Sequence, residues 1–107
     1  SLTEAGEKAF EKLMFDISSE PIHIFLDFNA VIVNLDSLPL EKKKMCIDSI
    51  QEKIKELKSY LEQNIREKEN MPEIPATGMA VLQQQFVLVE AIETWIDSVK
   101  QCLNGNE

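Results

Sequence analysis

The clearest pattern in the chain is a stripe of apolar residues that recurs every seven positions between Pro39 and Asn70. Such a heptad stripe predicts a long amphipathic helix that packs along another helix. Pro39 suits the first turn of a helix, and the acidic Glu41 follows it, so the helix should begin there. At 1.5 Å per residue it would span about 45 Å. The residues predicted to pack in the stripe are Ile47, Ile50, Ile54, Leu57 and Leu61.

A second apolar pattern, from Gly78 to Leu103, predicts another long helix whose apolar surface is wider than one stripe. Pro72 and Pro75 mark a short turn before it, so the two helices should pack antiparallel as a hairpin. One narrow stripe cannot cover so wide an arc, and a large exposed apolar patch is unfavourable on a monomer. The pattern therefore predicts a homodimer through this last helix. The predicted dimer contacts are Leu82, Phe86, Leu88, Val89, Ile92, Trp95, Ile96 and Val99.

Two shorter helical segments precede the hairpin. Thr3 suits the cap of a helix that runs to Met14, with acidic residues in its first turn. Residues 16–21 indicate a loop that ends in a proline. The segment from Ile22 to Asp36 has helical apolar spacing, although residues 30–33 alone would also fit a buried strand. We favour the helix, because the sequence offers no second strand for pairing, and so predict an all-α domain of four helices.

The charge and composition narrow the classes of function. The net charge of −8 argues against direct binding of nucleic acid or of an anionic membrane by these residues. No apolar run approaches the ~20 residues that a membrane span requires, and no secretory signal is present. The two cysteines form no disulfide framework, which predicts free thiols in a reducing cytoplasm.

Few residues offer chemistry. His23 is the only histidine, and no nucleophile or acid stands at a familiar catalytic spacing from it. The sequence has neither a Cys/His cluster for zinc nor a glycine-rich phosphate loop, so we expect no enzyme, metal or cofactor. Cys46 and Cys102 should lie level in the hairpin and are a candidate redox pair; alternatively both are small buried apolar residues. Trp95 is expected to anchor the core or the interface, or else to line an aromatic ligand cavity between subunits.

The first residues, "SLTEAGEKAF", resemble the exit from the wing of a winged helix-turn-helix DNA-binding domain. There a Leu ends the last wing strand, a Thr caps the next helix and a Gly allows close packing; Leu2, Thr3 and Gly6 match these positions. An aromatic-rich segment, "FLDFNAVIVNLDSLP", then precedes the heptad helix, the proline-marked turn and the final helix. This order is similar to that of the C-terminal region of PadR-like transcriptional regulators.

The resemblance implies one helical dimerisation domain over residues 1–107, with a linker helix at residues 1–14 and a helical core at residues 22–103. It also implies that the domain holds two winged helices in register, and that DNA is bound only through a winged helix preceding residue 1. Members of the family typically repress transcription and respond to small molecules, so a second copy and a small-molecule effector are the expected partners. The alternative is a stand-alone helical adaptor or chaperone-like module that binds a partner's amphipathic helix.

Overall fold

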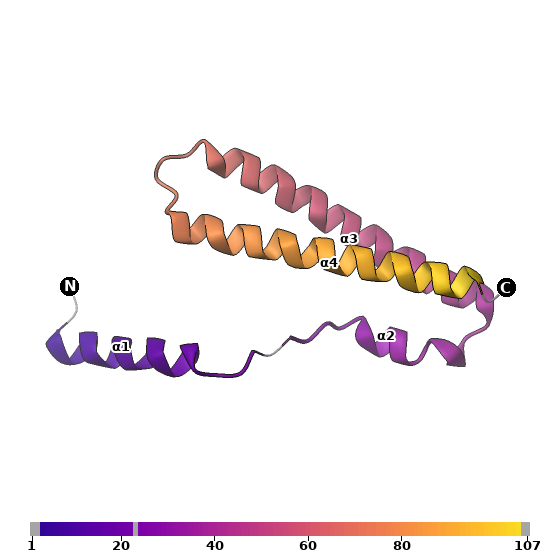
Figure 1. Cartoon of the computed structure of the whole chain (residues 1–107), viewed down its shortest axis with the longest axis horizontal. Coiled ribbons are helices and arrows are strands. Elements are labelled where there is room, and N and C mark those ends of the chain that lie inside the picture. Colours follow the sequence, from indigo (N-terminus) through magenta and orange to yellow (C-terminus); the bar gives the residue numbers. More distant parts are fainter. Residues whose placement is uncertain (1–2, 23, 106–107) are drawn as a thin grey trace.

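The computed structural model of the chain describes residues 3–22 and 24–105, and within these ranges it contains helices and no strand (Figure 1). The elements are α1 (Glu4–Ser18), α2 (Asn29–Val33), the 3₁₀ helix η1 (Leu35–Ser37), α3 (Leu40–Glu69) and α4 (Ala76–Gly105). The prediction of an all-α fold with a long helical hairpin is confirmed, since α3 and α4 pack against each other.

The two hairpin helices have nearly the predicted bounds. α4 begins two residues before the predicted Gly78, because the Pro75 carbonyl already accepts a hydrogen bond from the Met79 N–H at 3.2 Å. It also runs past the predicted end at Leu103 to Gly105. Among the described glycines none has a positive φ, so Gly105 extends the helix and does not form a left-handed cap.

α1 begins as predicted but ends later. The Thr3 Oγ1 accepts a hydrogen bond from the Gly6 N–H at 3.0 Å, which caps the first turn. The helix continues past the predicted end at Met14, as far as Ser18. The Ser18 hydroxyl donates to the Met14 carbonyl at 2.7 Å, and the next serine makes the same contact one residue later at 2.9 Å. These serines close the last turn of a helix where the sequence indicated a loop.

The single helix predicted from Ile22 to Asp36 is wrong. Residues 24–26 have no regular structure, a turn follows, and only the short α2 and η1 are helical. The Asn34 Nδ2 donates to the Ala30 carbonyl at 2.7 Å at the end of α2. Phe28, Ile32 and Leu35 keep helical spacing because they pack on the hairpin core, whereas Ile22, Ile24 and Phe25 stay largely exposed.

The core lies between α3 and α4 and is small. Its buried side chains are Ile47, Ile54 and Leu61 from α3, with Val89 and Ile96 from α4. Three of the five residues predicted to pack in the hairpin are therefore buried there. Ile50 packs half-buried beside them, and Leu57 is 47% exposed.

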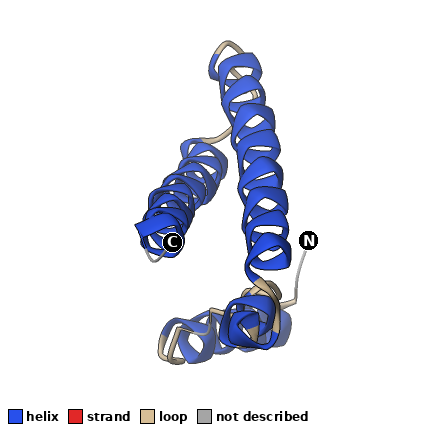
Figure 2. Cartoon of the chain, turned by 90° about the vertical axis from the view of Figure 1, so that its right-hand side faces the viewer, coloured by secondary structure: helices blue, strands red, loops and turns tan. Residues whose placement is uncertain are grey.

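The chain is extended. Its principal dimensions are 64 × 33 × 16 Å, and its radius of gyration is 19.8 Å. A compact domain of this length would have a radius of gyration of about 13 Å. α1 and the residues that follow it form an arm below the hairpin in both views (Figures 1 and 2). Most of the arm therefore contributes little to the core.

Two valines on α4 test the position of the core. Val89 is 7% exposed and Val87 is 61% exposed. Replacement by alanine removes the same atoms and improves helix propensity equally at both sites, so the difference between the variants reports burial alone. Val89→Ala should lower the free energy of unfolding by about 1.5 kcal/mol more than Val87→Ala does. Urea unfolding followed by circular dichroism at one protein concentration measures this, and equal effects would contradict the assigned core.

Candidate functional site

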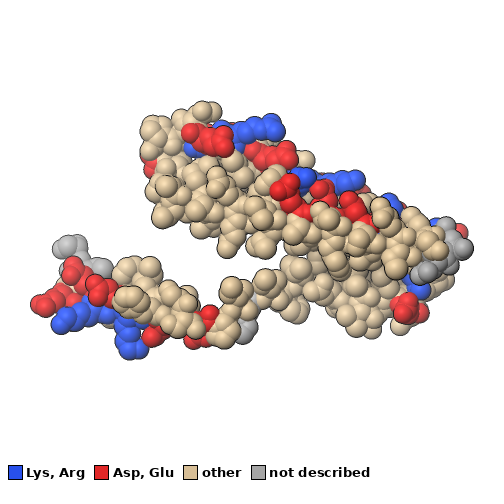
Figure 3. Space-filling view, viewed as in Figure 1, with Lys and Arg blue, Asp and Glu red and all other residues tan. Residues whose placement is uncertain are grey.

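The two edges of the hairpin differ in chemistry. Charged side chains gather along the hairpin edge away from the arm, whereas the surface that faces the arm is largely uncharged (Figure 3). The charged edge explains how α3 and α4 keep their register, and the uncharged one is the candidate site.

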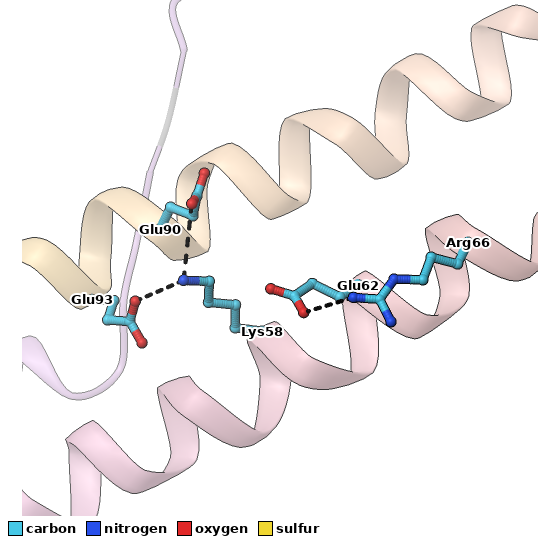
Figure 4. Close-up of polar contacts among 5 residues, drawn as sticks. All are labelled: Lys58, Glu62, Arg66, Glu90 and Glu93. Carbon is cyan, nitrogen blue, oxygen red and sulfur yellow. Dashed lines mark hydrogen bonds and ion pairs between the residues drawn. The ribbon is translucent and has the colours of Figure 1, made fainter. Parts of the chain in front are cut away.

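Lys58 is the centre of the contacts at the charged edge (Figure 4). Its Nζ lies 2.9 Å from the Glu93 Oε1 and 3.9 Å from the Glu90 Oε2, both on α4. The hydrogen bond that Lys58 donates to the Glu93 carboxylate raises the pKa of Lys58 above its ordinary value, and the negative charges of both glutamates act in the same direction. One turn further along α3, Glu62 and Arg66 form a pair at 3.6 Å. Lys58 thus joins the middle of α3 to the middle of α4.

Polar contacts between α3 and α4 continue toward the open end of the hairpin. The Lys100 Nζ lies 2.8 Å from the Asp48 Oδ1 and also donates to the Gln51 Oε1 at 3.3 Å. Gln51 in turn donates through Nε2 to the Asp97 Oδ1. Each step forward along α3 is matched by an equal step back along α4. These contacts, with those of Lys58, are called the polar ladder below, and they fix the antiparallel register of the hairpin.

This register places Cys46 level with Cys102, as the sequence predicted. Both thiols are free; Cys46 is half-buried and Cys102 is exposed. The alternative of two buried apolar residues therefore does not hold for Cys102. By helical spacing both lie on the edge opposite the polar ladder. The redox pairing itself stays a prediction.

The apolar edge of α4 is formed by Val81, Leu88 and Trp95, which recur every seven positions. Their side chains are 53%, 46% and 37% exposed, respectively. These three residues are called the α4 edge below. They lie beside the hairpin core and on the opposite side of α4 from Glu93 and Lys100. Residues 24–28 of the same chain approach Leu88 and Trp95, and the part of the edge that stays exposed can take another apolar surface.

A cleft of about 270 Å³ lies where the chain before α2 runs beside α4. Its lining residues are Ile24, Leu26, Asn29, Leu88, Ala91, Ile92 and Trp95. The Phe28 ring lies 5.8 Å from the Trp95 ring at an interplanar angle of 45°, which anchors α2 at the cleft. Asn29 is the only polar residue of the lining, so the cleft suits an apolar side chain or a small apolar molecule.

α1 carries a second exposed apolar surface. Phe10, Leu13, Met14 and Ile17 follow one side of the helix and are called the α1 stripe. Their side chains are between 53% and 62% exposed. The in-helix ion pairs of Lys8 with Glu4 and of Lys12 with Asp16 lie outside the stripe. No side chain of this helix is buried.

The structure separates the predicted dimer residues into two groups. Val89 and Ile96 are buried against α3 within one chain, so their assignment as dimer contacts is corrected. Leu82, Phe86, Ile92 and Val99 are half-buried, and the last three pack against the core. Only Leu88 and Trp95 are exposed, and both lie at the α4 edge.

Sequence reasoning missed two parts of the apolar surface. It treated α1 as a linker and did not single out its stripe as a contact surface. It also placed Ile22, Ile24 and Phe25 in a buried helix, whereas these side chains are 88%, 71% and 83% exposed. The available signal was the excess of apolar residues over the hairpin surface that could cover them.

The described residues contain no group of three or more His, Cys, Asp or Glu side chains that could hold a metal ion. None of the described helices is both long and apolar enough to cross a bilayer. His23 and Leu2, which the sequence analysis considered, lie outside the described residues. The exposed apolar surface is therefore the feature on which a function can be argued.

The Lys58 contact has a pH signature. Because the folded-state pKa of Lys58 is raised above 10.5, its stabilising effect is complete below that pH and is lost as the pH rises through the folded-state value. Lys58→Gln should therefore lower the free energy of unfolding at pH 8, and the difference from the unchanged chain should shrink above pH 10.5. Lys53→Gln is the control, since Lys53 is 76% exposed and pairs only within its helix with Glu56. Urea titrations across this pH range measure both, and a pH-independent difference would contradict the assignment.

Comparison of the chain with protein-family models, with curated proteins and with solved structures gave no significant match. The resemblance to PadR-like regulators therefore stays a prediction from motif and segment order.

Proposed function

We propose that the chain is the homodimerisation domain of a PadR-like winged-helix regulator of transcription, a repressor that acts in the cytoplasm. The observation that carries the dimer is the area of exposed surface. The chain exposes 8556 Å², whereas a compact monomer of its 12.2 kDa mass would expose about 6,100 Å². The excess of about 2,500 Å² is more than the ~800 Å² that each partner buries in a standard interface.

The character of this surface supports the same proposal. The α1 stripe, the residues before α2 and the α4 edge all expose large apolar side chains. Burial of one such side chain contributes about 1.5–3 kcal/mol, so a partner that covers several of them would bind tightly. A two-fold axis lets the same surfaces of two copies cover each other.

The regulatory step in this proposal is geometric. The capped α1 would lead from each DNA-binding head into the dimer, which then sets the separation and angle of the two heads. The acidic domain itself repels phosphate, so DNA would be bound only by the heads. An apolar effector would bind in the cleft beside Trp95 in competition with any segment that covers Leu88 and Trp95 in the dimer, and it would act only by binding two dimer geometries unequally.

The dimer is tested by mass in solution. Sedimentation equilibrium at micromolar concentration should give twice the chain mass of 12.2 kDa. A monomer at every concentration would overturn the proposal. It would favour the alternative, an adaptor that covers its apolar surface with the amphipathic helix of another protein.

The regulator is tested separately by the reading frame upstream of Ser1. Roughly 75 further residues patterned as a helix-turn-helix and a hairpin are expected there. The longer protein should protect two DNA half-sites whose centres lie about one helical turn apart, or a multiple of it. A longer protein without DNA affinity would overturn the regulatory role and leave the dimer unaffected.

A further inference from the structure

We propose that the two copies exchange their N-terminal helices, so that the α1 stripe of each chain packs on the α4 edge of the other. The inference rests on the proposed homodimer and names the surfaces that form it. The occupant of the α4 edge is therefore a second copy of this chain.

α1 needs a contact that its own chain does not provide in this structure. Every α1 side chain is exposed, including the four of the stripe. The helix has 15 residues, and an isolated helix of about that length is only marginally stable in water. A stable α1 with an exposed apolar stripe requires packing against a second surface.

The connection between α1 and the hairpin is irregular and allows α1 to reach another chain. Residues 19–28 contain no helix or strand among those described, and Pro21 disfavours helix in this stretch. Ten such residues can span up to about 33 Å. The connection carries α1 outward below the hairpin, toward the end where α3 turns into α4 (Figure 1). A short segment held outside its own domain by an extended connection is the arrangement that exchange between protomers uses.

The lack of charge on the facing surfaces of the arm and the hairpin also favours a second copy as the partner. An open space separates the arm from the hairpin, and the surfaces on its two sides are largely uncharged, while charged groups gather elsewhere (Figure 3). A strongly charged partner would gain little there and would lose hydration. A second copy supplies both complementary surfaces, an apolar helix for the α4 edge and an apolar edge for α1.

The lengths of α1 and of the α4 edge match. At 1.5 Å per residue, α1 is about 22 Å long, and the α4 edge from Val81 to Trp95 spans about 21 Å. Both surfaces also have helical periodicity, so their side chains can interdigitate as in other helix pairs. The excess of exposed area described above covers two such contacts, as two-fold symmetry requires.

Two phenylalanines on α1 provide a matched test. Phe10 lies in the stripe and is 53% exposed, whereas Phe15 lies off the stripe and is 71% exposed. Phe10→Glu should weaken the dimer about 100-fold, because the symmetric dimer loses the contact twice. Phe15→Glu should change the dissociation constant by less than about threefold. Sedimentation equilibrium gives both constants, and circular dichroism at high concentration checks that the hairpin is folded.

A mixing experiment distinguishes exchange from other uses of α1. Phe10→Glu disables the stripe, and Leu88→Glu disables the α4 edge at a side chain that is 46% exposed. Each variant alone should be monomeric at a concentration where the unchanged chain is dimeric. An equimolar mixture should form heterodimers, because the intact stripe of one variant meets the intact edge of the other.

The outcomes separate the two proposals. If both folded variants are monomeric and their mixture also stays monomeric, exchange is overturned. If either variant dimerises as well as the unchanged chain, the assignment of that surface is overturned while the proposed dimer stands. A monomeric unchanged chain overturns the proposed function itself.

Discussion

The burial of apolar side chains between α3 and α4 is the interaction on which the rest of the structure depends. Only five residues of the described chain are buried, and all of them lie in this contact. α2 and η1 are too short to be stable alone, and they hold their place because Phe28, Ile32 and Leu35 pack on the same core. The hairpin is thus a scaffold, and its edges carry whatever the domain does.

The polar ladder determines which edge of the hairpin is charged and which is apolar. Lys58, Lys100 and their acidic partners occupy one side of the helix pair, which leaves apolar residues for the other. Exposed ion pairs usually contribute little to stability, and the partly buried pair of Lys58 with Glu93 is the least exposed ion pair of the ladder. Their arrangement matters for register, since a slip by one turn would bring Lys58 away from both glutamates. The ladder therefore positions Leu88 and Trp95 on a common surface without touching either.

Long repeating patterns made α3 and α4 predictable. Ile47, Ile54 and Leu61 repeat over many turns, and one misplaced residue would not obscure such a pattern. The segment after Pro21 was not predictable, because whether its apolar residues form a helix depends on which of them reach the hairpin. The sequence also could not predict that Val89 is buried while Leu88 is exposed. Adjacent positions on a wide apolar arc become core or surface according to where the partner helix lies.

The exposed stripe of α1 has a consequence for the proposed regulator. A helix that owes its order to a neighbouring copy is a rigid lever only while that copy is present. In the proposed regulator, a monomer would carry its DNA-binding domain on a poorly ordered α1. Dimerisation would order α1 and bring two DNA-binding domains together in the same step. Assembly and mechanical coupling would then be one event, and protein concentration alone would determine whether the heads act together.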